Sequence, residues 1–447
     1  MIDQNKKYLV IVESPNKKGT IAGIFKDAGF KNVTVKASAG HITQIKDGGS
    51  YWNTGISPKD NFKINYQISP DKKKIVEELK AAVAKADRIF LCTDPDREGE
   101  AISWHLKKQL KIADKNYDRM TFHEITKSAV LKALDAPRKI DNDLVMAAQS
   151  RQVLDKITGY RLSPIARSAI GAKSVGRCQS AGLKLIVMRE EEIINFKVEK
   201  YYDLFVHFDK NSTKFKAKYV GTKKKEVKRI ETIDEVNAIK DLCKGKDFII
   251  KDVQKKELKE YPKPPFNTST FQQEANRVCG LSIDASASCA QKLFEGISVG
   301  GQHMGLITYI RTDDTTMSPE FAKILAAHVK GAFGPKYCGT LQTGKKSENA
   351  QEAHECIRVT NLSMTPTELA KYISDINLLK VYKLIYNRTL QAIMTPAVFN
   401  VTQYTIANGD QLFSMTSREL IFPGYRKVYT AEDSEDGETV LESFEAG

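Results

Sequence analysis

The sequence has few cysteines and places none of them close together. There are seven, they are far apart, they form no Cys-x-x-Cys pair, and their number is odd. This pattern argues against a zinc ribbon and against a disulfide framework. We therefore expect a protein of a reducing compartment that uses no zinc.

Long apolar runs are also missing, and none is long enough to cross a membrane. The first residues, MIDQNKKYLVIVES, lack the pattern of a signal peptide because their apolar stretch is short and ends in an acid. No internal repeat or low-complexity segment stands out. We expect a cytoplasmic protein without a membrane partner.

One segment partly matches an ATP-binding loop. GTLQTGKK, beginning at Gly339, has Lys346 where that loop requires Ser or Thr to bind magnesium, and no clear buried strand precedes it. We interpret it as a basic loop and expect no ATP site.

Acidic residues are outnumbered, since 69 Lys and Arg against 55 Asp and Glu give a net charge of +14. This charge favours a polyanionic partner, of which nucleic acid is the commonest, although a merely basic surface is the alternative. The lysines are spread along the chain, as expected of a channel assembled from several domains. With 447 residues, two to four domains are expected.

The first part of the chain alternates strand and helix signals. YLVIV and RIFLCT are short apolar runs typical of strands buried on both faces, and each precedes a helical pattern, the first over about 18–28. A third strand is expected at MTF, before a helix that follows Thr126. We predict a Rossmann-like α/β domain with at least some parallel strands.

The remaining segments predict helical and β-rich parts. Residues 141–195 read as helices, with an apolar stripe formed by Leu144, Ala147, Leu154 and Ile157. β patterns begin near 198 and return near the end, around a mostly helical insert entered through YPKPPF. Ser318–Pro319 and Thr365 with Glu368 mark helix starts. The predicted domains are an α/β domain at 1–140, a helical domain at 141–197, a β-rich arch at 198–262 and 397–447, and a mostly helical domain at 263–396.

Carboxylates follow two predicted strands. Glu13 ends the first strand, and Asp94, Asp96 and Glu98 follow another. Ligand sites of open α/β sheets lie beyond the carboxyl ends of the strands, so these side chains are able to converge and hold Mg²⁺. A solvated acidic loop is the alternative.

Two further motifs carry candidate catalytic residues. Tyr309 in LITYI is followed by Arg311, which would supply the cation that a phenol needs to act as a nucleophile; a buried tyrosine with a bonded hydroxyl is the alternative. His354 in EAHECIR is a catalytic or a structural histidine. Arg177 in SVGRCQS offers a phosphate contact or belongs to a helix-entry turn, and Arg151 is snorkelling, ion-paired or aimed at a phosphate.

Together these motifs resemble those of type IA DNA topoisomerases. VESPNKKGTI, LCTDPDREGEAISWHL, QSRQVLDKITGY, SVGRCQSAGL, GLITYIRTDDTT and EAHECIRVT follow the landmarks of that family in order. The first α/β unit looks like the TOPRIM domain, and YIRTD looks more like the bacterial topoisomerase I branch than the topoisomerase III branch, which usually has proline between the tyrosine and the arginine.

The resemblance implies a role for each matching residue. Tyr309 would attack a single-strand phosphodiester and keep the 5′-phosphate, Arg311 would stabilise the transition state, and Glu13 would act as general acid or base at the 3′-hydroxyl. Lys17 would contact the scissile phosphate and His354 would support the site. Mg²⁺ would be held by Asp94, Asp96, Glu98 and Glu13. The residues expected to contact DNA are Arg97, Arg151, Arg177, Gln179, Asp313 and Arg358.

The implied function is ATP-independent relaxation of negatively supercoiled DNA through a covalent phosphotyrosine, with an arm carrying Tyr309 that lifts away to pass a strand. We expect a DNA-associated monomer, in the nucleoid or a viral or nuclear equivalent. Family members continue with helices and zinc ribbons beyond the second β segment, so we expect a fragment of a longer enzyme or a partner chain. The alternatives are a TOPRIM nuclease or primase, and a fragment that only binds or cleaves single-stranded DNA.

Overall fold

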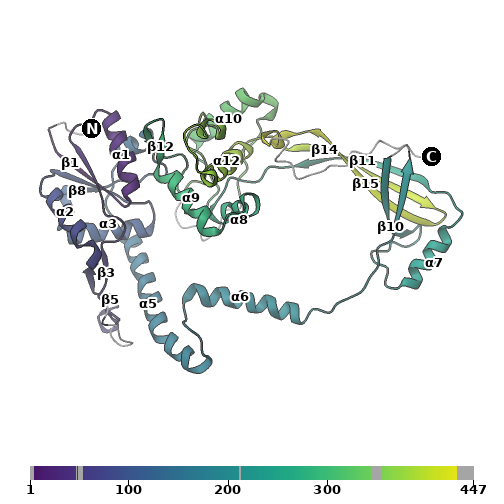
Figure 1. Ribbon diagram of the computed structural model, residues 1–447, viewed down its shortest axis with the longest axis horizontal. Coiled ribbons are helices and arrows are strands. Elements are labelled where there is room, and N and C mark those ends of the chain that lie inside the picture. Colours follow the sequence, from purple (N-terminus) through teal and green to yellow (C-terminus); the bar gives the residue numbers. More distant parts are fainter. Residues whose placement is uncertain (1–4, 47, 49–53, 211–212, 345–353, 430–447) are drawn as a thin grey trace. The chain divides into compact units, whose positions relative to one another are not determined.

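A computed structural model describes residues 5–46, 48, 54–210, 213–344 and 354–429 (Figure 1). Two compact units share the chain: the first comprises Met1–Ile194, Pro265–Met317 and Gly344–Tyr386, and the second comprises Asn195–Pro264, Ser318–Thr343 and Asn387–Gly447. The four-domain division remains a prediction, and the end of its last segment lies outside the described residues. Lys345 and Lys346 of the GTLQTGKK loop also lie outside them.

A four-stranded parallel sheet forms the centre of the first unit, which confirms the predicted parallel strands. Its order is β2-β1-β7-β8, with bounds Val33–Ala37, Tyr8–Val12, Arg88–Cys92 and Tyr117–Arg119. Val10 on the central strand pairs with Val35 on one side and Phe90 on the other. The strand expected at MTF lies three residues earlier, because the ladder between β7 and β8 covers Tyr117–Arg119.

Four helices accompany this sheet: α1 (Pro15–Asp27), α2 (Lys73–Val83), α3 (Arg97–Gln109) and α4 (Lys127–Asp135). Helix α1 begins earlier than predicted because Ser14 accepts a hydrogen bond from the backbone N–H of Asn16 and Pro15 occupies the first turn. Apolar side chains of β1, β7, α2 and α3 form the core beneath these helices. Two short antiparallel ladders are made by β3 (Thr43–Ile45) with β6 (Tyr66–Ile68) and by β4 (Ile56–Ser57) with β5 (Lys63–Ile64).

Two long helices follow, α5 (Asn142–Ile170) and α6 (Arg177–Ile194). The predicted apolar stripe of α5 is not its buried face: Val145 and Ala148 are buried, whereas Leu154 is 52% exposed. The difference arises because α5 packs against α3, and Val145 joins the core of the sheet domain. Every side chain of α6 is exposed. Among the described helices, none combines the length and apolar character that a bilayer span requires.

The segment that carries Tyr309 is irregular and lies among small elements of the first unit. These elements are α8 (Thr268–Cys279), α9 (Ile283–Glu295), β12 (Ile297–Val299), β13 (Gln302–Met304) and α11 (Pro366–Leu369), with α12 (Ile376–Gln391) continuing into the second unit. Ile307 forms a single β-bridge with Val359. The predicted start at Thr365 is confirmed, since its hydroxyl accepts from the N–H of Glu368 at 3.1 Å.

The second unit is built on a five-stranded antiparallel sheet of order β11-β14-β15-β10-β9. The strands are β9 (Phe205–Lys210), β10 (Thr213–Thr222), β11 (Ile249–Glu260), β14 (Ala397–Asn408) and β15 (Gln411–Phe422), and the helices are α7 (Ile233–Cys243) and α10 (Pro319–Phe333). The two predicted β segments therefore meet in one sheet. Ser318 caps α10 as predicted.

Glu260 ties together three side chains at the end of β11. It accepts hydrogen bonds from Arg418 at 2.7 Å, from Arg426 at 3.0 Å and from the Tyr425 hydroxyl. Both guanidinium groups also lie against the Phe399 ring, 3.5 and 4.9 Å from its centre. Although burial acts in the opposite direction, the hydrogen bonds lower the pKa of Glu260 to about 2.

We expect Glu260→Gln to destabilise the second unit at pH 7 by about 1–2 kcal/mol, because two guanidinium groups lose their charged acceptor. The folded-state pKa lies below the ordinary value of 4.5, so this contribution is present above that value and is lost as pH falls towards about 2. Thermal unfolding at several pH values measures the effect. Glu257→Gln, on the same strand and exposed, is the control; equal melting curves for the two variants at pH 7 would contradict the role of Glu260.

Candidate active site

Carboxylates from two strand ends meet at the carboxyl edge of the parallel sheet. Glu13 directly follows β1, and Asp94 and Asp96 follow β7. The Glu13 carboxylate accepts a hydrogen bond from the backbone N–H of Asp94 at 3.4 Å. Because β1 and β7 are parallel neighbours, their ends lie side by side even though the residues are distant in sequence.

The turn after β7 requires a glycine. Asp96 caps α3 by accepting from the N–H of Gly99 at 2.7 Å, and the Thr93 hydroxyl donates to the carbonyl oxygen of Gly99 at 2.5 Å. A Cβ atom at position 99 would lie 2.2 Å from the carbonyl oxygen of Asp94. The two aspartates are therefore positioned by a turn that admits no side chain at Gly99.

A fully buried arginine on β8 holds the same loop from behind. Arg119 donates to the carbonyl oxygens of Leu91, Thr93 and Met120 at 2.8–3.0 Å and to that of Asp94 at 2.7 Å. Its Nε donates to Glu100 at 3.0 Å. One guanidinium group thus satisfies the backbone where the chain leaves the sheet. Arg119 was not among the predicted site residues, although a charged residue within a buried strand was an available signal.

Lys17 reaches the site from α1. Its side chain is 2% exposed, its ammonium pairs with Asp94, and it lies 5.2 Å from the centre of the Phe294 ring. The same helix contacts the end of α9, where the Thr20 hydroxyl donates to the carbonyl oxygen of Glu295 at 2.9 Å. Helix α1 therefore links the acidic loop to the segment that leads to Tyr309.

The Tyr309 hydroxyl donates to the Asp96 carboxylate at 2.6 Å. Its backbone N–H donates to the carbonyl oxygen of His123 at 2.7 Å, and its ring makes edge contacts with Phe294 and His354. Tyr309 is 1% exposed. Burial, followed by the charges of Asp94 and Asp96, raises its pKa above the ordinary value, so the phenol keeps its proton in this arrangement.

Arg311 lies on the exposed side of the acidic loop that follows β7. Its Nη1 is 3.3 Å from Glu98 and 3.7 Å from Asp96. Glu98 also faces His41, whose Nε2 is 3.6 Å from the carboxylate. The nearby His41 ring, with a further contribution from the Arg311 charge, lowers the pKa of Glu98 to about 2.

Two histidines form a pair beside the tyrosine. The Nδ1 atoms of His123 and His354 are 3.2 Å apart, and burial lowers the pKa of both rings. One ring therefore donates and the other accepts, with both neutral. His41 and His123 were not predicted as site residues, although they follow β2 and β8 of the parallel sheet, where ligand-binding residues were expected.

The predicted DNA-contacting residues lie apart from this cluster or at its margin. Arg177 donates to Asp155 at 2.9 Å, and Arg151 is 3.7 Å from the same carboxylate. Gln179 donates to Ser174, Arg97 opens α3, Asp313 is exposed, and Arg358 is 3% exposed and held by Glu355 and Glu124. Their contacts with DNA stay predictions.

The acidic cluster fits a divalent cation by its chemistry. Within the described part of the chain, no group of three or more His, Cys, Asp or Glu side chains has metal-binding geometry, because Lys17 and Tyr309 are the partners of Asp94 and Asp96. Burial and the charge of Asp94 raise the pKa of Glu13, and burial raises that of Asp94. A cation beside these oxygens would relieve both costs, and Mg²⁺ prefers such ligands.

Comparisons with known proteins agree with this geometry. Residues 139–447 match the family described as DNA topoisomerase, and residues 8–125 match the Toprim domain. The chain belongs to the bacterial type IA DNA topoisomerases. A Campylobacter jejuni protein named DNA topoisomerase 1 is 38% identical over 99% of this chain and 62% of its own length. A Rickettsia felis protein of the same name is 39% identical, over 96% of this chain and 56% of its own.

A solved structure shows the same fold. The full-length topoisomerase I of Thermotoga maritima superposes with a TM-score of 0.82 at 32% identity, covering 98% of this chain and 69% of that one. The chain thus spans about 62% or less of the length of the curated relatives described above. The parallel sheet of this topoisomerase family member is its Toprim domain, and Tyr309 is bonded to an aspartate of that domain.

We expect Gly99→Ala to displace Asp94 and Asp96, because the new Cβ would overlap the Asp94 carbonyl oxygen. The thermal midpoint should fall, and the stabilisation that added Mg²⁺ gives the wild type should be lost. Gly23→Ala in α1 is the matched control, since no atom lies within 4 Å of its new Cβ; it should melt at or slightly above the wild-type temperature. A Gly99→Ala protein that Mg²⁺ stabilises as well as wild type would refute the requirement for glycine.

Proposed function

We propose that this chain catalyses ATP-independent, Mg²⁺-dependent cleavage of one DNA strand through a 5′-phosphotyrosine, followed by strand passage and religation that relaxes negative supercoils. The observation that carries the proposal is the 2.6 Å hydrogen bond between the Tyr309 hydroxyl and Asp96. This hydrogen bond holds the hydroxyl of Tyr309, a side chain that is able to form a covalent bond to phosphorus, directly against the carboxylates.

Two protons move in the proposed cleavage step. The phenolic oxygen of Tyr309 bonds to phosphorus while its proton passes to Asp96, which already accepts it in a hydrogen bond. The bond from phosphorus to the 3′-oxygen breaks, and that oxygen takes a proton from Glu13. Burial and Asp94 raise the pKa of Glu13, which suits it to act as the acid. Religation is the reverse, so bond energy is conserved without ATP.

Cations of the site would stabilise the charged transition state. Arg311 is exposed beside Asp96 and Glu98, and Lys17 is buried against Asp94. Both are preorganised near the position that the scissile phosphate must take when it meets Tyr309. Asp94 and Asp96, with Glu13 and Glu98, would hold Mg²⁺, which would add positive charge at the phosphate when bound.

Entry of DNA requires the tyrosine segment to part from the Toprim loop, since Tyr309 is 1% exposed. The side-chain contacts to be broken include Tyr309 to Asp96, Arg311 to Glu98, and His123 to His354. The backbone N–H of Tyr309 would also leave the carbonyl oxygen of His123, and the contacts of Arg358 with Glu124 and of Thr20 with Glu295 would open as well. DNA phosphates would then replace the carboxylate partners of three arginines. Arg311 would leave Glu98, and Arg151 on α5 and Arg177 on α6 would leave Asp155, which they share in the closed arrangement.

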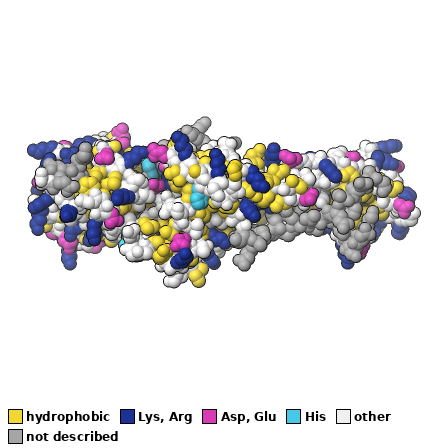
Figure 2. Space-filling view, turned by 90° about the horizontal axis from the view of Figure 1, so that it is seen from above, with side chains coloured by type: hydrophobic (Ala, Val, Ile, Leu, Met, Phe, Trp, Pro, Cys, Tyr) yellow, Lys and Arg dark blue, Asp and Glu magenta, His cyan; other side chains and the backbone are white. Residues whose placement is uncertain are grey.

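We take single-stranded regions of supercoiled DNA as the substrate and a DNA-associated monomer as the working form. Lysine and arginine side chains lie all along the face shown in Figure 2, in keeping with the net charge of +14. In this proposal the Toprim domain binds the cation, α5 and α6 bind the DNA strand, and residues 263–396 carry the nucleophile Tyr309.

We expect the full chain, incubated with Mg²⁺ and single-stranded DNA, to form a denaturant-resistant DNA adduct that Tyr309→Phe abolishes. Adduct is measured by denaturing gel with a 3′- or 5′-labelled oligonucleotide, and only the 3′-labelled one should stay attached. Tyr372→Phe, at an exposed position, is the control and should react normally. Nicks that form equally in the Tyr309→Phe variant would refute the proposal in favour of a Toprim nuclease.

We expect Asp96→Asn to slow adduct formation by about 100- to 10,000-fold, because the amide cannot take the phenolic proton. Chelation of Mg²⁺ should also stop religation in the wild type. Raising the Mg²⁺ concentration should not restore the variant, which separates the loss of the proton acceptor from weaker metal binding. Asp135→Asn, exposed at the end of α4, should match wild type; full restoration of Asp96→Asn by Mg²⁺ would contradict the assigned role.

A further inference from the structure

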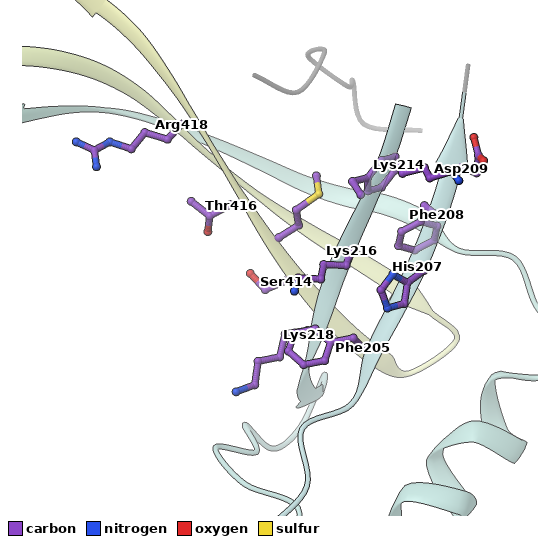
Figure 3. Close-up of a pocket in the computed structure, with 12 residues that line it drawn as sticks. Phe205, His207, Phe208, Asp209, Lys214, Lys216, Lys218, Ser414, Thr416 and Arg418 are labelled. Atoms are coloured by element: carbon purple, nitrogen blue, oxygen red, sulfur yellow. The ribbon is translucent and has the colours of Figure 1, made fainter. Parts of the chain in front are cut away.

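A wedge-shaped cleft opens in the second unit where two neighbouring strands separate. β10 pairs with β15 only over Lys218–Thr222, whereas its earlier residues pair with β9 alone. β15 likewise continues beyond Ser414 paired only with β14. Figure 3 shows the diverging strands and the side chains between them, and the cleft has a volume of about 860 Å³.

The walls of the cleft carry Lys214, Lys216, Lys218 and Arg418 against one acid, Asp209, and its floor is apolar. Lys214, Lys216 and Lys218 alternate along β10 and therefore project from one face of the sheet (Figure 3). Ser414, Thr416 and Arg418 line the opposite side on β15. Phe208, Phe215 and Met415 contribute the apolar lining and pack with the core beneath.

Two of these cations have no ion pair within the described part of the chain, and one of the two lies beside an exposed aromatic ring. Lys218 pairs with Asp203 and Arg418 with Glu260, each at 2.7 Å. Lys214 and Lys216 have no carboxylate at ion-pair distance among the residues that the structure describes. The Lys216 ammonium lies 5.1 Å from the centre of the Phe205 ring, and Phe205 is 40% exposed on the edge strand.

We propose that this cleft binds single-stranded DNA, as a second contact separate from the site at Tyr309. Cations at every second residue of a strand match a phosphate backbone, and an exposed aromatic ring gives an unstacked base a surface on which to lie. The hydroxyls of Ser414 and Thr416 add hydrogen-bond partners. An acidic peptide would use the lysines but has no need of Phe205.

The test uses the full chain and an oligothymidylate containing iodouridine, which crosslinks to a stacked aromatic ring on irradiation. We expect a crosslinked peptide that contains Phe205. In Lys214→Ala/Lys216→Ala its yield should fall about tenfold, while crosslinks elsewhere in the chain are unchanged. Lys224→Ala/Lys225→Ala removes the same charge from exposed positions just after β10 and should leave the yield at Phe205 unaltered.

Phe205→Ala should weaken binding of the oligonucleotide at this cleft by about tenfold without changing the melting curve, because its ring is an exposed one on an edge strand. Absence of any crosslink at Phe205, or equal losses in the two lysine variants, would overturn the proposal. Competition by polyglutamate as strong as that by unlabelled oligothymidylate would also overturn it, and would assign the cleft to acidic proteins. Each outcome is independent of adduct formation at Tyr309.

Discussion

The hydrogen bond between Tyr309 and Asp96 is the interaction on which the candidate site depends. It joins a loop of the Toprim domain to a segment encoded far later in the chain. The loop is fixed by backbone demands that leave little freedom: Gly99 admits no side chain, and Arg119 occupies the carbonyl oxygens that emerge from the sheet. The phenol therefore meets a carboxylate whose position the fold has already set.

The electrostatics of this loop follow from concentrating acids where little water reaches them. Burial disfavours the charged forms of Glu13 and Asp94, and the two charges also repel. Lys17 and Arg311 offset part of that cost from two separate segments of the chain. A protein folded only for stability would not gather these acids; an enzyme that must bind a cation and a phosphate has reason to do so.

The sequence predicted those parts of the site that follow local rules. Apolar runs located β1 and β7, and the geometry of parallel sheets then brought Glu13 towards Asp94. The sequence could not show that Tyr309 contacts Asp96, because that contact depends on how two distant segments of the chain pack together. His41, His123 and Arg119 were missed because each is a single residue outside a recognisable motif, and the only signal was its position in or after a strand of the sheet. The buried face of α5 was misjudged because packing against α3, and not periodicity alone, selects Val145 and Ala148.

The proposed nucleophile, Tyr309, is protonated and buried, and this also protects it from unwanted reactions. Because burial and two aspartates hold the proton on Tyr309, tyrosine-selective reagents and stray phosphoesters meet an inert phenol for as long as the loop is closed. In the proposed mechanism, the phenol would become reactive only when the segment that carries Tyr309 moves to admit DNA. Under the proposed function, the enzyme without bound DNA would keep its tyrosine protonated and out of solvent, and would therefore not cleave.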